Sequence, residues 1–264
     1  MMLEPAHHLK IRKRKQYLIA VEGVLIHGDH MIPGADRFVR LLNERGVRFL
    51  LLTNNSRRTP QNLAENLQTL GVPVSAKHIY TSAMATARFL RSQKPGGSAY
   101  VIGENGLLSA IHEVNFAITE QNPDFVVLGG AEEYDFDQIT KAINFITKGA
   151  HFICTNPDPN GQSKNGLTPA SGAMAALIVK ATKAIPFFIG KPNPFMMRSA
   201  LNFLGLHSKD TIMVGDQMDT DIIAGLESGM ETILVLSGGS TPEDLSRFAY
   251  RPNHLIRSIA DLEP

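Results

Sequence analysis

Short apolar runs alternate with amphipathic helical patterns along most of this chain, and this alternation limits its possible folds more than any other feature. Residues 47–52 (VRFLLL) are typical of a buried strand, whereas Phe38, Leu41 and Leu42 recur at helical spacing. Alternating strands and helices predict parallel sheets covered by helices. The predicted class is therefore α/β, and 264 residues allow one large domain or two smaller ones.

The expected elements follow from these patterns and from the turn residues between them. The expected strands are residues 16–21, 47–52, 79–81, 99–102, 116–119, 125–128, 152–154, 187–189, 211–214 and 232–236. The expected helices are residues 34–45, 60–70, 83–91, 106–114, 136–148, 172–182, 194–204 and 220–228. Residues 156–166, rich in Asn, Pro and Gly, are expected to form a loop, and residues 93–98 and 182–186 are the best hinge candidates.

Composition excludes several kinds of partner. The formal net charge is +1, so no global field attracts nucleic acid or a membrane surface. The basic run at residues 10–15 (KIRKRK) is expected to be a solvated lead-in. Cys154 is the single cysteine, which rules out an internal disulfide and suits a reducing compartment. With no apolar stretch long enough for a signal core or a bilayer span, a cytoplasmic location is expected.

Polar residues with uses in phosphate chemistry follow several of the expected strands. Active sites in open parallel sheets lie at the carboxyl ends of the strands. At the end of the second strand, Thr53, Asn54 and Asn55 offer a hydroxyl and backbone N–H groups that can hold phosphoryl oxygens. After a later strand, Lys191 offers an ammonium that can neutralise charge developing on a transferred group.

A pair of carboxylates follows the strand at residues 211–214. Asp216 and Asp221 suit a hard cation such as magnesium, which prefers oxygen ligands. Taken singly, these residues have simpler explanations as a strand end, a turn, a loop lysine and helix caps. Their occurrence together, in order and at strand ends, favours a common site.

Six stretches of the chain resemble the haloacid dehalogenase (HAD) superfamily and, within it, the NagD-like phosphatases. They are residues 23–35 (GVLIHGDHMIPGA), 51–56 (LLTNNS), 80–87 (YTSAMATA), 155–158 (TNPD), 190–194 (GKPNP) and 214–221 (VGDQMDTD). The resemblance implies a doubly wound, Rossmann-like core of residues 1–92 and 186–264, with an α/β cap of residues 93–185 inserted. It also implies magnesium, a small phosphorylated metabolite as substrate, and a covalent aspartyl-phosphate intermediate. Caps of this kind mediate dimers in similar proteins, which leaves a homodimer open.

The resemblance assigns roles to residues of this chain. Thr53 matches the phosphate-binding threonine, and Lys191 matches the lysine that steadies nucleophile and phosphate. The implied metal ligands are Asp216, Asp221 and the backbone of Glu22. The implied substrate-binding residues are Thr53, Asn54, Asn55, Asn156, Asp158 and Lys191. Asn156 and Asp158 belong to a cap loop that faces substrate in similar proteins, although an Asn-Pro turn explains them equally well.

The first strand departs from the family pattern. Similar proteins end this strand with Asp-x-Asp-Gly, in which the first aspartate attacks phosphorus and binds magnesium and the second acts as acid and base. Here these positions hold Ala20 and Glu22. Ala20 has no heteroatom, so it can neither attack phosphorus nor bind metal. Glu22 keeps a carboxyl group but is one methylene longer, which shifts its reach. Efficient turnover is therefore not expected.

Three explanations of Ala20 remain open: divergence to a non-catalytic phosphate-binding or regulatory module, an engineered inactive variant of an active phosphatase, and an active enzyme that uses Glu22 or Asp29 as nucleophile. Divergence accounts for both Ala20 and Glu22 and is favoured. Nucleotide monophosphates and sugar phosphates are both implied as ligands. Dinucleotide-dependent redox chemistry fits poorly, because no Gly-x-Gly-x-x-Gly follows the first strand.

Overall fold

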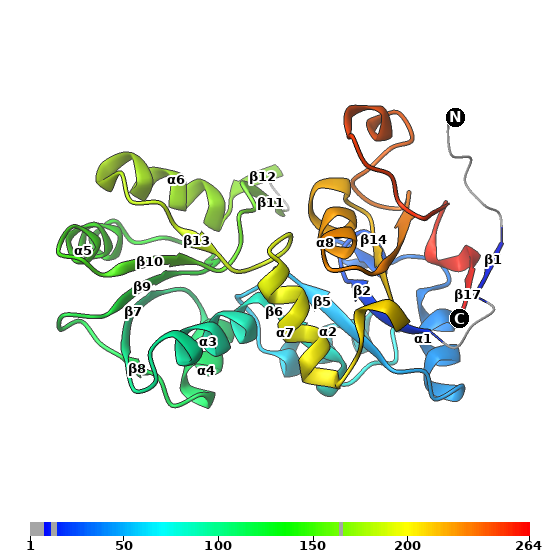
Figure 1. Ribbon diagram of the computed structural model, residues 1–264, viewed down its shortest axis with the longest axis horizontal. Coiled ribbons are helices and arrows are strands. Elements are labelled where there is room, and N and C mark those ends of the chain that lie inside the picture. The colour runs from blue at the N-terminus through cyan, green and yellow to red at the C-terminus, as the bar shows by residue number, and fades with distance from the viewer. Residues whose placement is uncertain (1–7, 12–14, 164–165) are drawn as a thin grey trace. The chain divides into compact units, whose positions relative to one another are not determined.

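The computed structural model describes residues 8–11, 15–163 and 166–264 (Figure 1). The chain divides into a first unit of Met1–Thr53, Gln61–Tyr80 and Pro194–Pro264 and a second unit of Asn54–Pro60 and Thr81–Asn193. Residues 12–14 of the basic run and residues 164–165 lie outside the described residues. No helix in the described ranges is both long and apolar enough to cross a bilayer.

In the described part of the first unit, six strands form one sheet in the order β16-β15-β14-β2-β5-β6. They are β2 (Gln16–Ala20), β5 (Phe49–Thr53), β6 (Ile79–Thr81), β14 (Thr211–Gly215), β15 (Glu231–Val235) and β16 (His254–Ile256). β2 pairs in parallel with both β5 and β14. From β2 the chain adds β5 and β6 on one side, then returns to add β14, β15 and β16 on the other. The sheet is therefore doubly wound, as expected, and its switch point lies between β2 and β14.

The strands at the centre of this sheet are continuous apolar runs, the pattern typical of strands that are buried on both faces. In β2 and β5, residues such as Leu18 and Leu50 are fully buried. The helices of this part are α1 (Ala35–Glu44), α2 (Pro60–Thr69), α7 (Pro194–Leu204) and α8 (Ile223–Glu227). Small strand pairs supplement the sheet: β1 (Leu9–Lys10) with β17 (Leu262–Glu263), and β3 (Ile26–His27) with β4 (His30–Met31).

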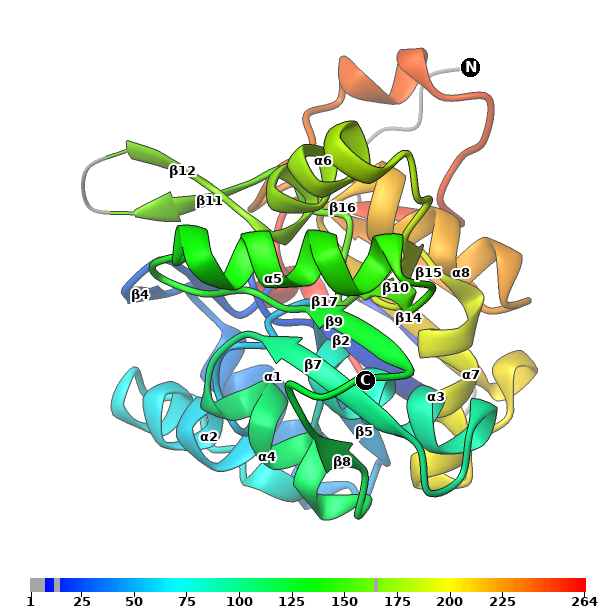
Figure 2. The ribbon, with the colours of Figure 1, turned by 90° about the vertical axis from the view of Figure 1, so that its left-hand side faces the viewer.

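The second unit has a sheet of its own. Five strands of its described residues follow the order β13-β10-β9-β7-β8: β7 (Ser98–Ile102), β8 (Ala117–Ile118), β9 (Phe125–Leu128), β10 (His151–Cys154) and β13 (Phe187–Phe188). All the pairings are parallel. The helices are α3 (Ser82–Gln93), α4 (Asn105–Glu113), α5 (Phe136–Thr147) and α6 (Ser171–Thr182), with α5 and α6 on one face of the sheet and α3 and α4 on the other (Figure 2).

The prediction that residues 156–166 form a loop was wrong for residues 160–163 and 166, which lie in strands. Antiparallel strands β11 (Asn160–Ser163) and β12 (Gly166–Pro169) form a hairpin in and beyond this stretch. The residues of β12 are all exposed. No apolar alternation marks β12, because none of its residues is buried.

The predicted helix at residues 220–228 also differs, since a π-helical turn at Met218–Ile222 precedes the short α8. The short strands β1, β3, β4, β16 and β17 were not predicted.

The grouping of segments differs from the predicted boundaries. Residues 54–60 and 81–92 group with the second unit, and β13 pairs with β10 of the second sheet although the core was expected to resume at residue 186. The apolar pattern of β13 could not reveal which sheet it joins. The assignment of an inserted cap to residues 93–185 stays a prediction.

The central position of β2 leads to a test of stability. Leu18 is fully buried in β2, and Leu18→Ala leaves a cavity, so we expect it to lower the free energy of unfolding by about 2–5 kcal/mol. Leu177 on α6 is 45% exposed, and the matched change Leu177→Ala should cost about 0.5 kcal/mol or less. Urea unfolding followed by circular dichroism measures both. Equal midpoints for the two variants would contradict the burial of β2.

Candidate functional site

The carboxyl ends of β2, β5 and β14 bring several predicted site residues of the first unit to one edge of its sheet. Ala20 is the last residue of β2, pairs with Leu52 and is 2% exposed. Thr53 ends β5, and Asp216 directly follows β14. Because these strands are parallel and adjacent, Ala20, Thr53 and Asp216 lie at the same edge, beside the switch point of the sheet. The side chain at the end of β2 is a methyl group.

The Asp216 carboxylate is buried and tightly enclosed by backbone. Its Oδ2 accepts a hydrogen bond from the Gly239 N–H at 2.7 Å. A Cβ atom at Gly23 or at Gly238 would lie 2.2 Å from this same oxygen. Gly23 also has φ +73°, a conformation that favours glycine. The chain after β2 and the chain after β15 can approach the Asp216 carboxylate this closely only because both positions lack a side chain.

Asp221 stabilises the turn that presents Asp216. It is 1% exposed, and its Oδ2 accepts hydrogen bonds from the backbone N–H groups of Asp216 at 3.1 Å and Gln217 at 3.2 Å. A carboxylate that accepts two N–H groups holds that segment of backbone in place. Asp221 was predicted as a metal ligand, and these contacts give it a structural role at the first turn after β14.

Glu22 lies in a tight turn between β2 and the β3–β4 hairpin. The Leu25 N–H donates to the Val21 carbonyl at 3.0 Å, and the Gly23 N–H donates to the Ile26 carbonyl at 2.8 Å. The Glu22 side chain as a whole is exposed, but surrounding protein atoms desolvate its carboxyl group and raise its pKa. The Gly28 N–H and His27 oppose this rise, and Asp29 adds to it. A carboxyl group with a raised pKa keeps its proton to higher pH.

The residues at this edge could supply only part of the coordination shell of a magnesium ion. Among the described residues, no group of three or more His, Cys, Asp or Glu side chains could hold a metal ion. Mg²⁺ commonly uses one or two carboxylates and completes its shell with water and phosphate oxygens. Asp216 can supply one carboxylate, and backbone carbonyls near Glu22 can add to it. A magnesium ion held here would complete its shell with water and phosphate oxygens.

In the second unit, the Asn54 side chain makes hydrogen bonds with two other residues of the predicted site, Lys191 and Asp158. Its Oδ1 accepts the Lys191 N–H at 2.8 Å, and its Nδ2 donates to the Lys191 carbonyl at 3.1 Å. The same Nδ2 donates to the Asp158 carboxylate, with distances of 3.1 Å and 3.3 Å to its two oxygens. Lys191 is 7% exposed. Asn54, Asp158 and Lys191 therefore form one connected set.

Asn156 holds the loop that carries Asp158. Its Oδ1 accepts the Asp158 N–H at 3.1 Å, as in an Asx turn, and the Ser171 hydroxyl at 2.8 Å. Its Nδ2 donates to the Asn54 carbonyl at 2.9 Å. Burial raises the pKa of Cys154 to about 12, so this thiol stays protonated and donates to the Asn156 carbonyl. The Asn-Pro turn, which was an equally good explanation of these residues, is present, and its Asn156 side chain also binds the Asn54 backbone.

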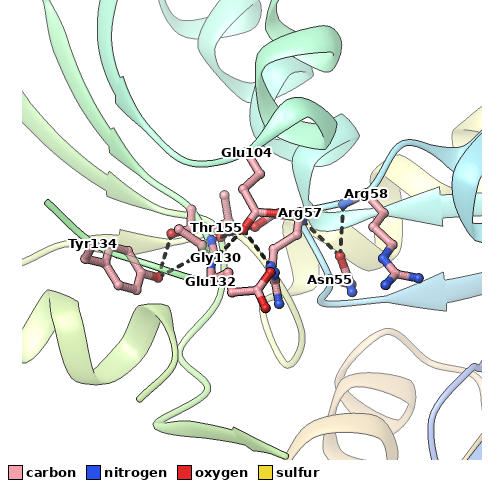
Figure 3. A network of polar contacts seen from close by, with 11 residues as sticks. Asn55, Arg57, Arg58, Glu104, Gly130, Glu132, Tyr134 and Thr155 are labelled. Carbon is pink, nitrogen blue, oxygen red and sulfur yellow. Dashed lines mark hydrogen bonds and ion pairs between the residues drawn. The ribbon is translucent and has the colours of Figure 1, made fainter. Parts of the chain in front are cut away.

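The Asn55 side chain binds the turn that follows it. Its side chain is exposed, and its Oδ1 accepts the backbone N–H groups of Arg57 at 2.9 Å and Arg58 at 3.2 Å (Figure 3). Arg57 in turn makes ion pairs with Glu104 at 2.9 Å and Glu132 at 3.0 Å. The contacts of Asn55 therefore shape the turn that begins the segment 54–60.

Several residues of these networks were not predicted. They are Ser82, which donates to the Asn54 carbonyl, Ser171, which donates to Asn156, and Ser237, Gly238, Gly239 and Ser240, which surround Asp216 and Gly23. Residues 237–240 (SGGS) could have been found from the sequence, because two glycines between serines directly follow an expected strand of the parallel sheet. Ser82 lies in the family-like stretch 80–87, but it was not singled out because the first position of a helix often holds serine. Ser171 had no signal, because it also looks like an ordinary helix-start residue.

The role of Asp221 as a backbone acceptor can be tested by its removal. Asp221→Ala leaves two backbone N–H groups without their acceptor, so we expect the free energy of unfolding to fall by about 2–3 kcal/mol. Asp219 is exposed on the same turn, and Asp219→Ala should cost less than about 1 kcal/mol. Urea unfolding without metal gives both values. If Asp221→Ala is as stable as the unchanged chain, Asp221 does not stabilise this turn, and only its predicted role as a metal ligand remains.

Comparisons with known proteins identify the family. Residues 17–117 match the family model described as haloacid dehalogenase-like hydrolase, and residues 188–262 match a related model described as HAD-hydrolase-like. The chain is 54% identical over 246 residues to dihydroxyacetone phosphatase of Corynebacterium glutamicum, covering 93% of this chain and 90% of that protein. It is 43% identical over 249 residues to ribonucleotide monophosphatase NagD of Escherichia coli, covering 94% and 98%.

The fold agrees with this assignment. The solved structure of NagD from Escherichia coli K-12 matches with a TM-score of 0.90 over 94% of this chain and 98% of that one. Sequence and structure thus agree across nearly the whole length. This chain belongs to the haloacid dehalogenase-like hydrolase family, within its NagD-like phosphatases.

Proposed function

We propose that this chain binds small organic phosphates, with magnesium as cofactor, at a phosphate site of the HAD type, and that it does not hydrolyse them efficiently. The observation that carries the proposal is the methyl group of Ala20 at the carboxyl end of β2, beside Thr53 and Asp216. Phosphoryl transfer through a covalent intermediate needs a nucleophile at that place. In another hydrolase class, loss of the nucleophile costs on the order of a million-fold in turnover.

The residues that remain suit binding. The Thr53 hydroxyl can donate to a phosphoryl oxygen, and the Lys191 ammonium can neutralise phosphate charge. Magnesium, when bound, would offset further charge on the phosphate oxygens, with Asp216 as its carboxylate ligand. Replacement of an aspartate by Ala20 removes a negative charge from beside the phosphate, so ligand affinity need not fall.

Glu22 is better suited to the role of acid than to that of nucleophile. Glu22 stands two residues after Ala20, at the position where the family resemblance places the acid and base, so it is placed for that role and not for attack on phosphorus. An active enzyme that uses Glu22 in place of Ala20 is therefore the weaker alternative.

The ligand class comes from the relatives. Curated relatives are named dihydroxyacetone phosphatase, ribonucleotide monophosphatase and acid sugar phosphatase. Their substrates share a phosphate on a small organic group, and this chain is proposed to bind the same class. Sugar phosphates, triose phosphates and nucleotide monophosphates form the panel to test.

Binding without turnover is the first test. Isothermal calorimetry with magnesium and this panel should find a ligand, while a phosphate-release assay on the same ligands stays near background. Thr53→Ala and Lys191→Ala should each weaken binding about tenfold, the size of one lost hydrogen bond to a charged group. Asp219→Ala, an exposed change, serves as the control. Unchanged affinity in both site variants would show that phosphate binds elsewhere or not at all.

Repair of the first motif is the second test. Ala20→Asp supplies both a nucleophile and a carboxylate ligand, so it should give measurable phosphate release and tighter magnesium binding. Adding Glu22→Asp should raise the rate further, because the acid regains its expected reach. Glu22→Asp alone should change almost nothing, and the two changes should be strongly non-additive because they act on one phosphoryl group.

Each result of the repair has a separate meaning. A folded double variant that stays inactive on every phosphate would place the defect beyond β2 and leave a binding module. Efficient hydrolysis by the unchanged chain would overturn the proposal and direct the search for a nucleophile to Glu22 and Asp29.

A further inference from the structure

We propose that Asn54 is a positioning residue for Lys191: its side-chain amide holds the Lys191 backbone in place and is itself anchored to Asp158. The inference rests on the proposed function in one respect, since it takes the Lys191 ammonium to bind phosphate. It goes beyond that function, because the family resemblance placed Asn54 and Asp158 among the substrate-binding residues.

The amide of Asn54 pairs with both backbone groups of Lys191. Oδ1 accepts the Lys191 N–H at 2.8 Å, and Nδ2 donates to the Lys191 carbonyl at 3.1 Å. A planar amide that accepts from and donates to the same residue fixes both the position and the orientation of that residue. The lysine side chain, which has several rotatable bonds, therefore starts from a fixed backbone.

Asp158 anchors the other side of the amide. Nδ2 has two hydrogens, and the arrangement uses one toward the Lys191 carbonyl and one toward the Asp158 carboxylate, at 3.1 Å and 3.3 Å from its oxygens. An ionised acceptor strengthens this hydrogen bond. The carboxylate also sets which end of the Asn54 amide is nitrogen, and so directs Oδ1 to the Lys191 N–H.

The backbone of Asn54 is equally well fixed. Its carbonyl accepts the Ser82 hydroxyl at 2.6 Å and the Asn156 Nδ2 at 2.9 Å. A Cβ atom at Gly190 would lie 2.6 Å from Asn54 Oδ1. Only glycine at position 190 therefore allows the chain that leads to Lys191 to approach the amide so closely.

The segment that follows Asn54 is bound to the carboxyl ends of the second sheet. Ser56 Oγ accepts the Gly130 N–H after β9 at 2.9 Å and the Thr155 hydroxyl after β10 at 3.2 Å. Arg57 pairs with Glu104, which follows β7, as Figure 3 shows. The segment that carries Asn54 is thus bound to the chain that follows β7, β9 and β10 of the second unit.

This arrangement explains why an asparagine is needed. Asn54→Ala leaves the N–H and the carbonyl of Lys191 without the amide. Asn54→Asp has nearly the same shape but replaces the donor with an oxygen, so it loses the bond to the Lys191 carbonyl and sets a carboxylate against that of Asp158. Both changes should allow Lys191 to shift, and a misplaced ammonium binds phosphate less well.

The test is a double-mutant cycle on the full chain with inorganic phosphate as the probe. Calorimetry with magnesium gives the dissociation constant for the unchanged chain, Asn54→Ala, Asn54→Asp, Lys191→Ala and the double variant Asn54→Ala/Lys191→Ala. We expect Asn54→Ala and Asn54→Asp each to weaken phosphate binding about tenfold. In the Lys191→Ala background, Asn54→Ala should change binding by less than about twofold, because its effect passes through Lys191.

Controls separate positioning from a general loss of structure. Asn144 is exposed on α5, and Asn144→Ala should leave phosphate binding unchanged. Circular dichroism reports the fold of each variant. If Asn54→Ala does not fold, the Asn54→Asp change of similar shape, alone and with Lys191→Ala, completes the cycle.

The outcomes distinguish the two proposals. If Lys191→Ala weakens binding but Asn54→Ala and Asn54→Asp do not, the positioning role is overturned and the proposed function stands. A tenfold effect of Asn54→Ala that persists in the Lys191→Ala background also overturns it, since Asn54 would then act by another route. If Lys191→Ala itself has no effect, the proposed phosphate site is wrong and the positioning role falls with it.

Discussion

The parallel pairing of β2 with β5 on one side and β14 on the other is the constraint on which the first unit depends. Ile19 pairs with Val214, and Ala20 pairs with Leu52. This register brings the residues at the ends of these strands to one edge, where the winding of the sheet reverses. A shift of one residue in β2 would turn every buried side chain of that strand to the opposite face. The register therefore sets which residue of β2 lies beside Thr53 and Asp216, and that residue is Ala20.

Glycines and backbone N–H groups shape this edge as much as the acidic residues do. Asp216 is enclosed by Gly23 and Gly238 and is presented by a turn that Asp221 stabilises. These contacts do not use the side chain of residue 20. The form of this edge therefore does not depend on the Ala20 side chain.

The second unit shows a different use of polar residues. Asn54 directly follows Thr53, yet it belongs with Lys191 and Asp158, which are more than a hundred positions later. Side-chain amides suit such a junction because each offers donors and an acceptor in one plane. Buried polar groups need partners, and here Asn54 and Asn156 supply them to backbone from several segments.

The sequence by itself determined the fold class, most strands and helices, and the family, because apolar periodicity and short motifs are local properties of the chain. It also revealed Ala20 and Glu22 at the first motif, since those positions are set by their distance from Gly23. Tertiary structure decided that β13 joins the second sheet, that residues 160–169 form a hairpin, and that Asn54 contacts the Lys191 backbone. These features depend on pairings between distant segments and on the direction of individual side chains, which no local pattern of residues specifies.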